Sequence, residues 1–128
     1  MRRKESTSTV NPSRSSQPRR GEIWTANTGG KKHFVVVVSL DARNLNDRAE
    51  SILIVPFGSY GRPGPTVLTM AAGETGLPEV SYLKAHFISV LQKTDLIDRL
   101  PRMLSNAQMR SVVQAVQRAI DPDAPFAG

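Results

Sequence analysis

The alternation of short β-prone runs with turn residues is the feature of this sequence that most constrains its fold. From Gly21 on, runs rich in Val, Ile and Phe are bounded by Gly, Pro, Asn or Asp, a pattern typical of a small β domain. The run at 34–40 is apolar on both faces and is predicted to be a central strand. Pro56 indicates a strand end or a bulge in the run at 52–57, because proline lacks a backbone donor. The predicted strands are 22–26, 34–40, 52–57, 66–70, 80–85 and 87–91.

One helix is expected near the C-terminal end. Ser105, followed three residues later by Gln108, makes a capping box, which satisfies two backbone N–H groups of the first helical turn. An apolar stripe at helical spacing then runs up to Pro122 and consists of Met109, Val112, Val113, Val116 and Ile120. Such a stripe usually packs on its own domain. The expected fold class is mainly β (α+β): a small, strongly bent, mostly antiparallel sheet, closed or half-closed into a barrel, with a C-terminal α-helix.

The positive charge of the chain, +6 in total, is concentrated near its N-terminus. Residues 1–20 contain six Arg or Lys against one Glu, which leaves only +1 for the rest of the chain. Residues 1–19 are rich in Ser and Arg and poor in apolar side chains, so they are predicted to be a disordered basic tail. Residues 20–122 are predicted to form one domain, followed by a short tail at 123–128. An anion site in the domain therefore requires local clustering of bases.

The chain has no cysteine and no long apolar run, which narrows its location and its chemistry. Its apolar runs fall far short of the roughly 20 residues of a membrane-spanning helix, and no secretory signal is recognisable, so a cytoplasmic protein without membrane contact is expected. Without cysteine there is no disulfide, zinc knuckle or thiol nucleophile. His33 and His86 stand far apart in the sequence without metal-ligand companions, so neither a metal site nor a cofactor is predicted.

A cluster of basic side chains stands directly before the central run of valines. Lys31, Lys32 and His33 follow Gly29 and Gly30, where the two glycines allow the chain to reverse. The cluster is either a hairpin loop that needs soluble residues or a site for an anionic ligand. The residues alone leave both interpretations open.

Five stretches of the chain, in one order, resemble the MazF/PemK family of toxins from bacterial toxin–antitoxin pairs. They are PRRGEIW, HFVVVVSLDARN, ILIVPFGS, TGLPEVSYLKAHFISV and a terminal helix after RLPRMLS. No single stretch is decisive, but RGEIW before a valine-rich strand, followed by TGLP-x-x-S, is a specific combination. The resemblance covers residues 18–120 of the chain.

The resemblance implies both a fold and an activity. The family fold is an SH3-like barrel shared with the CcdB toxins, usually assembled as a homodimer. The family activity is a metal-independent endoribonuclease, or mRNA interferase, which cuts single-stranded RNA through attack of the substrate's own 2′-hydroxyl. The products are a 2′,3′-cyclic phosphate and a 5′-hydroxyl. The implied partners are the RNA substrate and a cognate antitoxin that is acidic and partly disordered.

The chain departs from the family pattern at two positions that matter for this activity. The family's second strand begins R-P-V, and His33 stands at the position of that arginine. The family's V-P-x-T-S motif supplies a catalytic threonine, and Gly58 stands at its position, with Ser59 one residue further. The first loop is also short and lacks the usual Gly-x-Glu-Gln element.

Three interpretations of function follow from the resemblance. In the active interpretation, His33 and His86 are acid/base groups and Ser59 supplies a hydroxyl, because an imidazole both accepts and donates protons near neutral pH. The residues expected to bind RNA in that case are Lys31, Lys32, Arg62 and Lys84. In the second interpretation, the loss of arginine and threonine leaves a protein that binds RNA or antitoxin without cleavage. In the third, the chain is a CcdB-like gyrase inhibitor. Trp24 and Tyr82 are interpreted as core or dimer-interface aromatics, not as platforms for base stacking.

Overall fold

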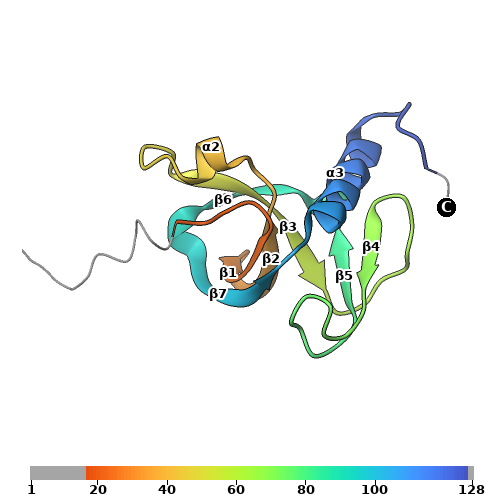
Figure 1. Ribbon diagram of the computed structural model, residues 1–128, viewed down its shortest axis with the longest axis horizontal. Helices are drawn as coiled ribbons and strands as arrows, with labels where there is room; N and C mark the ends of the chain where they lie inside the picture. Colours follow the sequence, from red (N-terminus) through yellow and green to blue (C-terminus); the bar gives the residue numbers. More distant parts are fainter. Residues whose placement is uncertain (1–16, 127–128) are drawn as a thin grey trace, which may run out of the picture.

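The computed structural model describes residues 17–126, which form one curved antiparallel sheet and a C-terminal helix (Figure 1). The strands are β1 (Glu22–Thr28), β2 (Lys31–Val37), β3 (Ser51–Gly58), β4 (Val67–Met70), β5 (Ser81–Lys84), β6 (Ser89–Gln92) and β7 (Leu96–Met103). The helices are α2 (Asp41–Asn44), α3 (Asn106–Ile120) and two 3₁₀ turns, η1 (Ala85–Phe87) and η2 (Lys93–Asp95). The strand order is β4-β5-β3-β2-β1-β7, and β6 pairs with β3. The predicted mainly β fold with a C-terminal helix is confirmed.

The hairpin between β1 and β2 is tighter than the sequence predicted. Cα pairing continues as far as Thr28 opposite Lys31, so only Gly29 and Gly30 form the turn. Their φ angles of +58° and +82° suit a two-residue turn of the type whose twist matches the strands. Strand β2 therefore starts at Lys31, not at residue 34, and the basic cluster belongs to a strand and not to a loop. The pairing extends because glycine adopts positive φ without strain.

Strand β3 is shared between the two ends of the sheet. Its first half pairs with β6, and its last residues, Phe57 and Gly58, pair with β5. Pro56 lies inside β3, opposite Val35 of β2, between the pairings with β6 and β5. The predicted strand end or bulge at Pro56 is therefore wrong, because the missing N–H falls where β3 changes its neighbour.

Two segments after residue 80 differ from the predicted strands. The predicted strands at 80–85 and 87–91 are separated by the η1 turn, and the second of them, β6, begins only at Ser89. Strand β7 was not predicted. All of its side chains are exposed or half-buried, so it lacks a buried apolar alternation, and it contains Pro101. It lies at the edge of the sheet beside β1, where a proline is tolerated.

The core has two parts, one on each face of β2. Val35 and Val37 point into the curl of the sheet, whereas Val36 points to the side covered by α3. This confirms β2 as a central strand that is apolar on both faces. Trp24 belongs to the core inside the curl, and its indole N–H donates to the Glu22 carboxylate at 3.1 Å. The prediction of Trp24 as a core aromatic is thus confirmed.

Helix α3 packs against the second part of the core, as the apolar stripe predicted. Met109, Val112 and the unpredicted Ala115 are buried, and Val116 packs at the margin. Val113 and Ile120 are instead exposed, so the stripe buried on this domain is narrower than predicted. Figure 1 shows that the far end of α3, which closes with Ile120, extends beyond β4 and β5.

The capping box of α3 is present, and it supports a stability prediction. The Gln108 N–H donates to Ser105 Oγ at 3.1 Å, and the Ser105 N–H donates to Gln108 Oε1 at 2.8 Å. We expect Ser105→Ala to lower the free energy of unfolding by about 1 kcal/mol, since it leaves a helix-end donor without a partner. Urea denaturation followed by circular dichroism measures this. Ser111→Ala, in the exposed middle of the same helix, is the matched control; an equal loss there would contradict the capping role.

Residues at the start of the described chain are held by hydrogen bonds to the domain. The Arg19 N–H donates to Glu22 Oε1 at 2.8 Å, and the Arg20 N–H donates to Asp41 Oδ1 at 2.7 Å. The predicted disordered tail lies, for residues 1–16, outside the described residues. Over the described part of the chain, no helix is long and apolar enough to cross a membrane.

Candidate functional site

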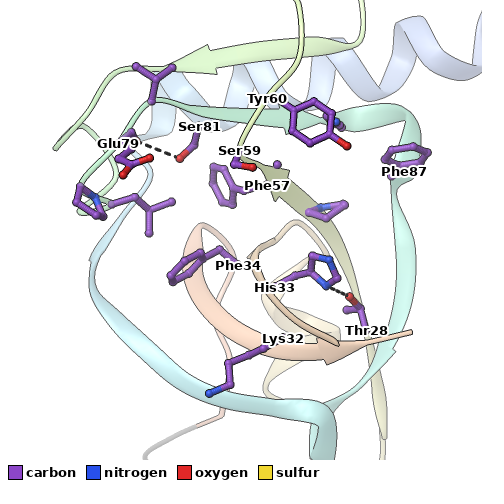
Figure 2. A pocket seen from close by; sticks show the side chains of 16 residues that line it. Thr28, Lys32, His33, Phe34, Phe57, Ser59, Tyr60, Glu79, Ser81 and Phe87 are labelled. Atoms are coloured by element: carbon purple, nitrogen blue, oxygen red, sulfur yellow. Dashed lines mark hydrogen bonds between the residues drawn. The ribbon is translucent and has the colours of Figure 1, made fainter. Parts of the chain in front are cut away.

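A cleft of about 560 Å³ opens between the tip of the β1–β2 hairpin and the end of β3 (Figure 2). The two strands separate there because β2 pairs with β3 only from Val35 onwards. The preceding residues of β2 pair with β1 alone, so the hairpin tip projects beside the cleft. Residues 77–81 and the η1 turn close the remaining sides.

The structure brings together four of the side chains predicted to form a site. They are Lys32 and His33 from β2, Ser59 from the loop after β3, and Lys84 from β5. The three segments that carry these residues are far apart in the sequence, and the antiparallel pairing of β3 with both β2 and β5 places them around one space. The cleft lining therefore includes an imidazole, a hydroxyl and two lysines, of which Lys32 points its side chain away from the other labelled residues (Figure 2).

His33 is half-buried and anchored on one side of its ring. Its Nδ1 shares a hydrogen bond of 2.5 Å with Oγ1 of Thr28, on the neighbouring strand (Figure 2). This bond fixes the ring orientation and occupies Nδ1. Within residues 17–126, no hydrogen bond engages the other ring nitrogen, Nε2. Nε2 can therefore accept a proton in the tautomer whose Nδ1–H donates to Thr28 Oγ1.

The Lys84 ammonium lies directly beside Gly58. A Cβ atom at Gly58 would be 3.1 Å from Cε and 3.2 Å from Nζ of Lys84. The ammonium also stands 4.8 Å from the centre of the Tyr60 ring, a favourable cation–π distance. The absence of a side chain at position 58 thus leaves room for the head of Lys84 at the end of β3.

Three other predicted site residues do not line the cleft. Lys31 is opposite Thr28 at the turn, and Arg62 lies exposed in the loop after β3. His86 shares a hydrogen bond of 2.9 Å with Thr66 Oγ1, and its ring packs on Phe87 with centroids 4.4 Å apart. RNA binding by Lys31 and Arg62 and acid/base catalysis by His86 stay predictions, and the lining of this cleft gives them no support. In the described part of the chain, no group of three or more His, Asp or Glu could hold a metal ion.

Sequence reasoning missed the acidic and aromatic residues of the cleft. Glu79 lines it, together with the exposed rings of Phe34, Tyr60 and Phe87. Glu79 belongs to the TGLPEVSY stretch, but nothing in its spacing indicated that the loop would carry it to the cleft. Phe34 and Phe87 were equally hidden, because a phenylalanine in a predicted strand looks like a core residue in the sequence.

Solved structures of similar fold come from bacterial toxins. An endoribonuclease from a mycobacterial species, in complex with its cognate antitoxin, is 25% identical, with a TM-score of 0.69 over 85% of this chain and 98% of that chain. The Mycobacterium tuberculosis toxin MazF-mt6 has the same TM-score at 17% identity, over 78% of this chain and 96% of its own. A MazE–MazF structure from Deinococcus radiodurans, 17% identical, aligns with a TM-score of 0.65 over 81% of this chain and 95% of that one.

These likenesses confirm the predicted barrel fold, and a family-level match agrees with them. No curated protein sequence matches the chain at a significant level. A family model matches residues 19–120, nearly the whole described chain. The chain therefore belongs to the PemK-like, MazF-like toxins of type II toxin–antitoxin systems.

Proposed function

We propose that this protein is an endoribonuclease that cleaves single-stranded RNA in the cleft beside the β1–β2 hairpin. The observation that carries the proposal is that His33 and Lys84 line one cleft, with the Lys84 ammonium at the position where Gly58 leaves space. An acid/base group and a fixed positive charge are the two components that phosphodiester cleavage by an internal hydroxyl requires. The 25%-identical mycobacterial structures, both described as endoribonucleases, support the same activity.

The proposed reaction assigns one role to each side chain. Nε2 of His33 accepts the proton of the 2′-hydroxyl as O2′ bonds to phosphorus and the bond from phosphorus to O5′ breaks. The Lys84 ammonium stabilises the negative charge that builds on the phosphoryl oxygens, and Lys32 at the rim contributes to RNA binding. The Ser59 hydroxyl donates a hydrogen bond to the same oxygens, and O5′ takes a proton from water as it leaves. The products are a 2′,3′-cyclic phosphate and a 5′-hydroxyl, and no protein nucleophile is needed.

The direct test is incubation of the purified protein with a long RNA in the presence of EDTA. We expect cleavage at defined positions, and enzymatic mapping of the product ends should find cyclic phosphates and 5′-hydroxyls. An RNA whose nucleotides are 2′-deoxy at the mapped positions is the matched control and should stay intact. RNA that is bound but remains uncut over hours would contradict the proposal and support a protein that only binds RNA or antitoxin.

We further propose that the protein acts as a homodimeric toxin that is neutralised by an acidic antitoxin. The mycobacterial endoribonuclease and the Deinococcus radiodurans toxin were both solved with antitoxin chains. In the proposed complex, antitoxin carboxylates would compete with RNA phosphates for the cations of the cleft. A second reading frame beside that of this protein, encoding an acidic chain that suppresses RNA cleavage, is the expected genetic and biochemical evidence.

Position 58 offers a prediction about the hydroxyl that the family pattern carries there. The φ angle of Gly58 is not positive. An added Cβ would meet the flexible end of Lys84 at 3.1–3.2 Å and the Tyr60 carbonyl oxygen at 3.5 Å, so a side chain can be accommodated once the Lys84 head shifts. We expect Gly58→Thr to cleave about tenfold faster than Gly58→Val, because the hydroxyl adds a donor for the phosphoryl oxygens. The two side chains have nearly the same shape, so the ratio of single-turnover rates isolates the hydroxyl. Equal rates for both variants would remove position 58 from the proposed site.

A further inference from the structure

Glu79 contributes the only carboxylate among the residues that line the cleft. The residue is exposed, and within residues 17–126 no hydrogen bond or ion pair engages its carboxylate. Its backbone is held in place, since Ser81 Oγ donates to the Glu79 carbonyl at 3.3 Å. Glu79 thus stands at the rim of a cleft whose other titratable lining residues include Lys32, His33 and Lys84.

A free carboxylate is unfavourable beside a phosphate, because like charges repel. Glu79 therefore does not fit a cleft that binds only the RNA backbone. A nucleobase, in contrast, presents N–H donors that a carboxylate accepts well. Single-stranded RNA leaves the Watson–Crick edges of its bases open for such contacts. The position of Glu79 is thus suited to a base and not to a phosphate.

We propose that Glu79 selects guanine beside the scissile phosphate, an inference that rests on the proposed function. Guanine is the standard base with two parallel donors, N1–H and N2–H, on its Watson–Crick edge, and these match the two carboxylate oxygens. Adenine and cytosine each offer one amino group flanked by an acceptor, and uracil offers one N–H between two carbonyls. Only guanine satisfies both carboxylate oxygens without placing an acceptor against one of them.

An aromatic ring stands where such a base would stack. Phe34 is 37% exposed, although it directly precedes the buried Val35 in β2, and it lines the cleft. Figure 2 shows Phe34 and Glu79 on one side of the cleft, and Thr28 and Phe87 on the other. A base stacked on Phe34 would direct its edge to Glu79 and leave its phosphate toward His33. Stacking on an aromatic ring accepts any base, so the discrimination falls to Glu79.

The test measures binding and cleavage separately. Short, fluorescein-labelled oligouridines with 2′-O-methyl groups, which cannot be cleaved, carry one central guanine, inosine, adenine or cytosine. For the wild-type protein we expect the guanine oligonucleotide to bind about tenfold or more tightly than the adenine or cytosine ones, with inosine in between because it lacks the N2 amino group. Glu79→Gln should reduce the ratio of guanine to adenine affinity by about tenfold. Glu50→Gln, at an exposed glutamate outside the cleft, should leave the ratio unchanged.

The outcomes separate this inference from the proposed endoribonuclease. Cleavage mapped on a random RNA library without guanine next to the cut sites would overturn the guanine inference and leave the nuclease intact. Guanine-selective binding that depends on Glu79, without cleavage, would overturn the nuclease and leave the inference intact. Equal affinity for the four oligonucleotides, no measurable binding, or the same preference in Glu79→Gln would each overturn the role of Glu79.

Discussion

Replacing His33 with alanine should lower the rate of RNA cleavage by at least about 100-fold. The variant removes the imidazole that we propose as the proton acceptor, and a positioned acid/base group contributes about 10²–10⁴-fold to such reactions. The hydrogen bond with Thr28 is lost as well, but its partner is half-buried and can be hydrated. Single-turnover cleavage of a defined RNA measures the chemical step without product release.

Two companion variants make the His33 result specific. His86→Ala removes the other imidazole, which the structure places outside the cleft lining, and we expect a smaller loss. His33→Arg restores the cation found at this position in the family pattern and should retain more activity than the alanine variant. Thermal denaturation of all three must show folded protein. If His33→Ala cleaves at the wild-type rate while folded, the proposed mechanism is wrong.

Replacing Asn44 with leucine should lower the free energy of unfolding by about 2–4 kcal/mol. Asn44 is fully buried. Its amide group donates to the Ser39 carbonyl at 2.7 Å and to Asp41 Oδ1 at 3.0 Å, and its carbonyl accepts from Ser39 Oγ at 2.5 Å. Leucine has a similar size but leaves these buried groups without their partners, and an unsatisfied buried polar group costs about 1–3 kcal/mol.

The Asn44 network matters because it joins three separate segments. Ser39 Oγ also accepts from the Leu53 N–H of β3 at 3.1 Å, and Asp41 accepts from the Arg20 N–H before β1. Its loss should therefore loosen the contacts among the chain before β1, α2 and β3 together. Urea denaturation measures the change, and Asn27→Leu, at an exposed position of β1, is the matched control, expected within about 0.5 kcal/mol of wild type. An equally small effect at Asn44 would contradict the structural role of the network.

The parts of the fold that could be predicted from the sequence are those whose signal lies within a few neighbouring residues of the chain. The valines of β2 indicated a buried central strand, and Ser105 with Gln108 indicated the start of α3, because each pattern reports on its own neighbourhood. Strand β7 carries no such signal. Its side chains are mostly exposed, and its pairing with β1 depends on a neighbour more than 60 residues away in the sequence. The position of Pro56 likewise became interpretable only when the partners on both sides of β3 were known.

The amino-acid sequence by itself determined the fold class, the central strand, the capped helix and the family resemblance, all of which depend on residue order. The tertiary structure decided which of the predicted site residues meet. Lys32, His33, Ser59 and Lys84 share a cleft because β3 pairs with β2 on one side and β5 on the other, while Lys31, Arg62 and His86 lie outside its lining. The tertiary structure also showed that Glu79 lines this cleft, and it placed the Lys84 ammonium beside Gly58. The physical reason is that a site depends on side-chain directions across paired strands, and strand register is a property of the assembled sheet.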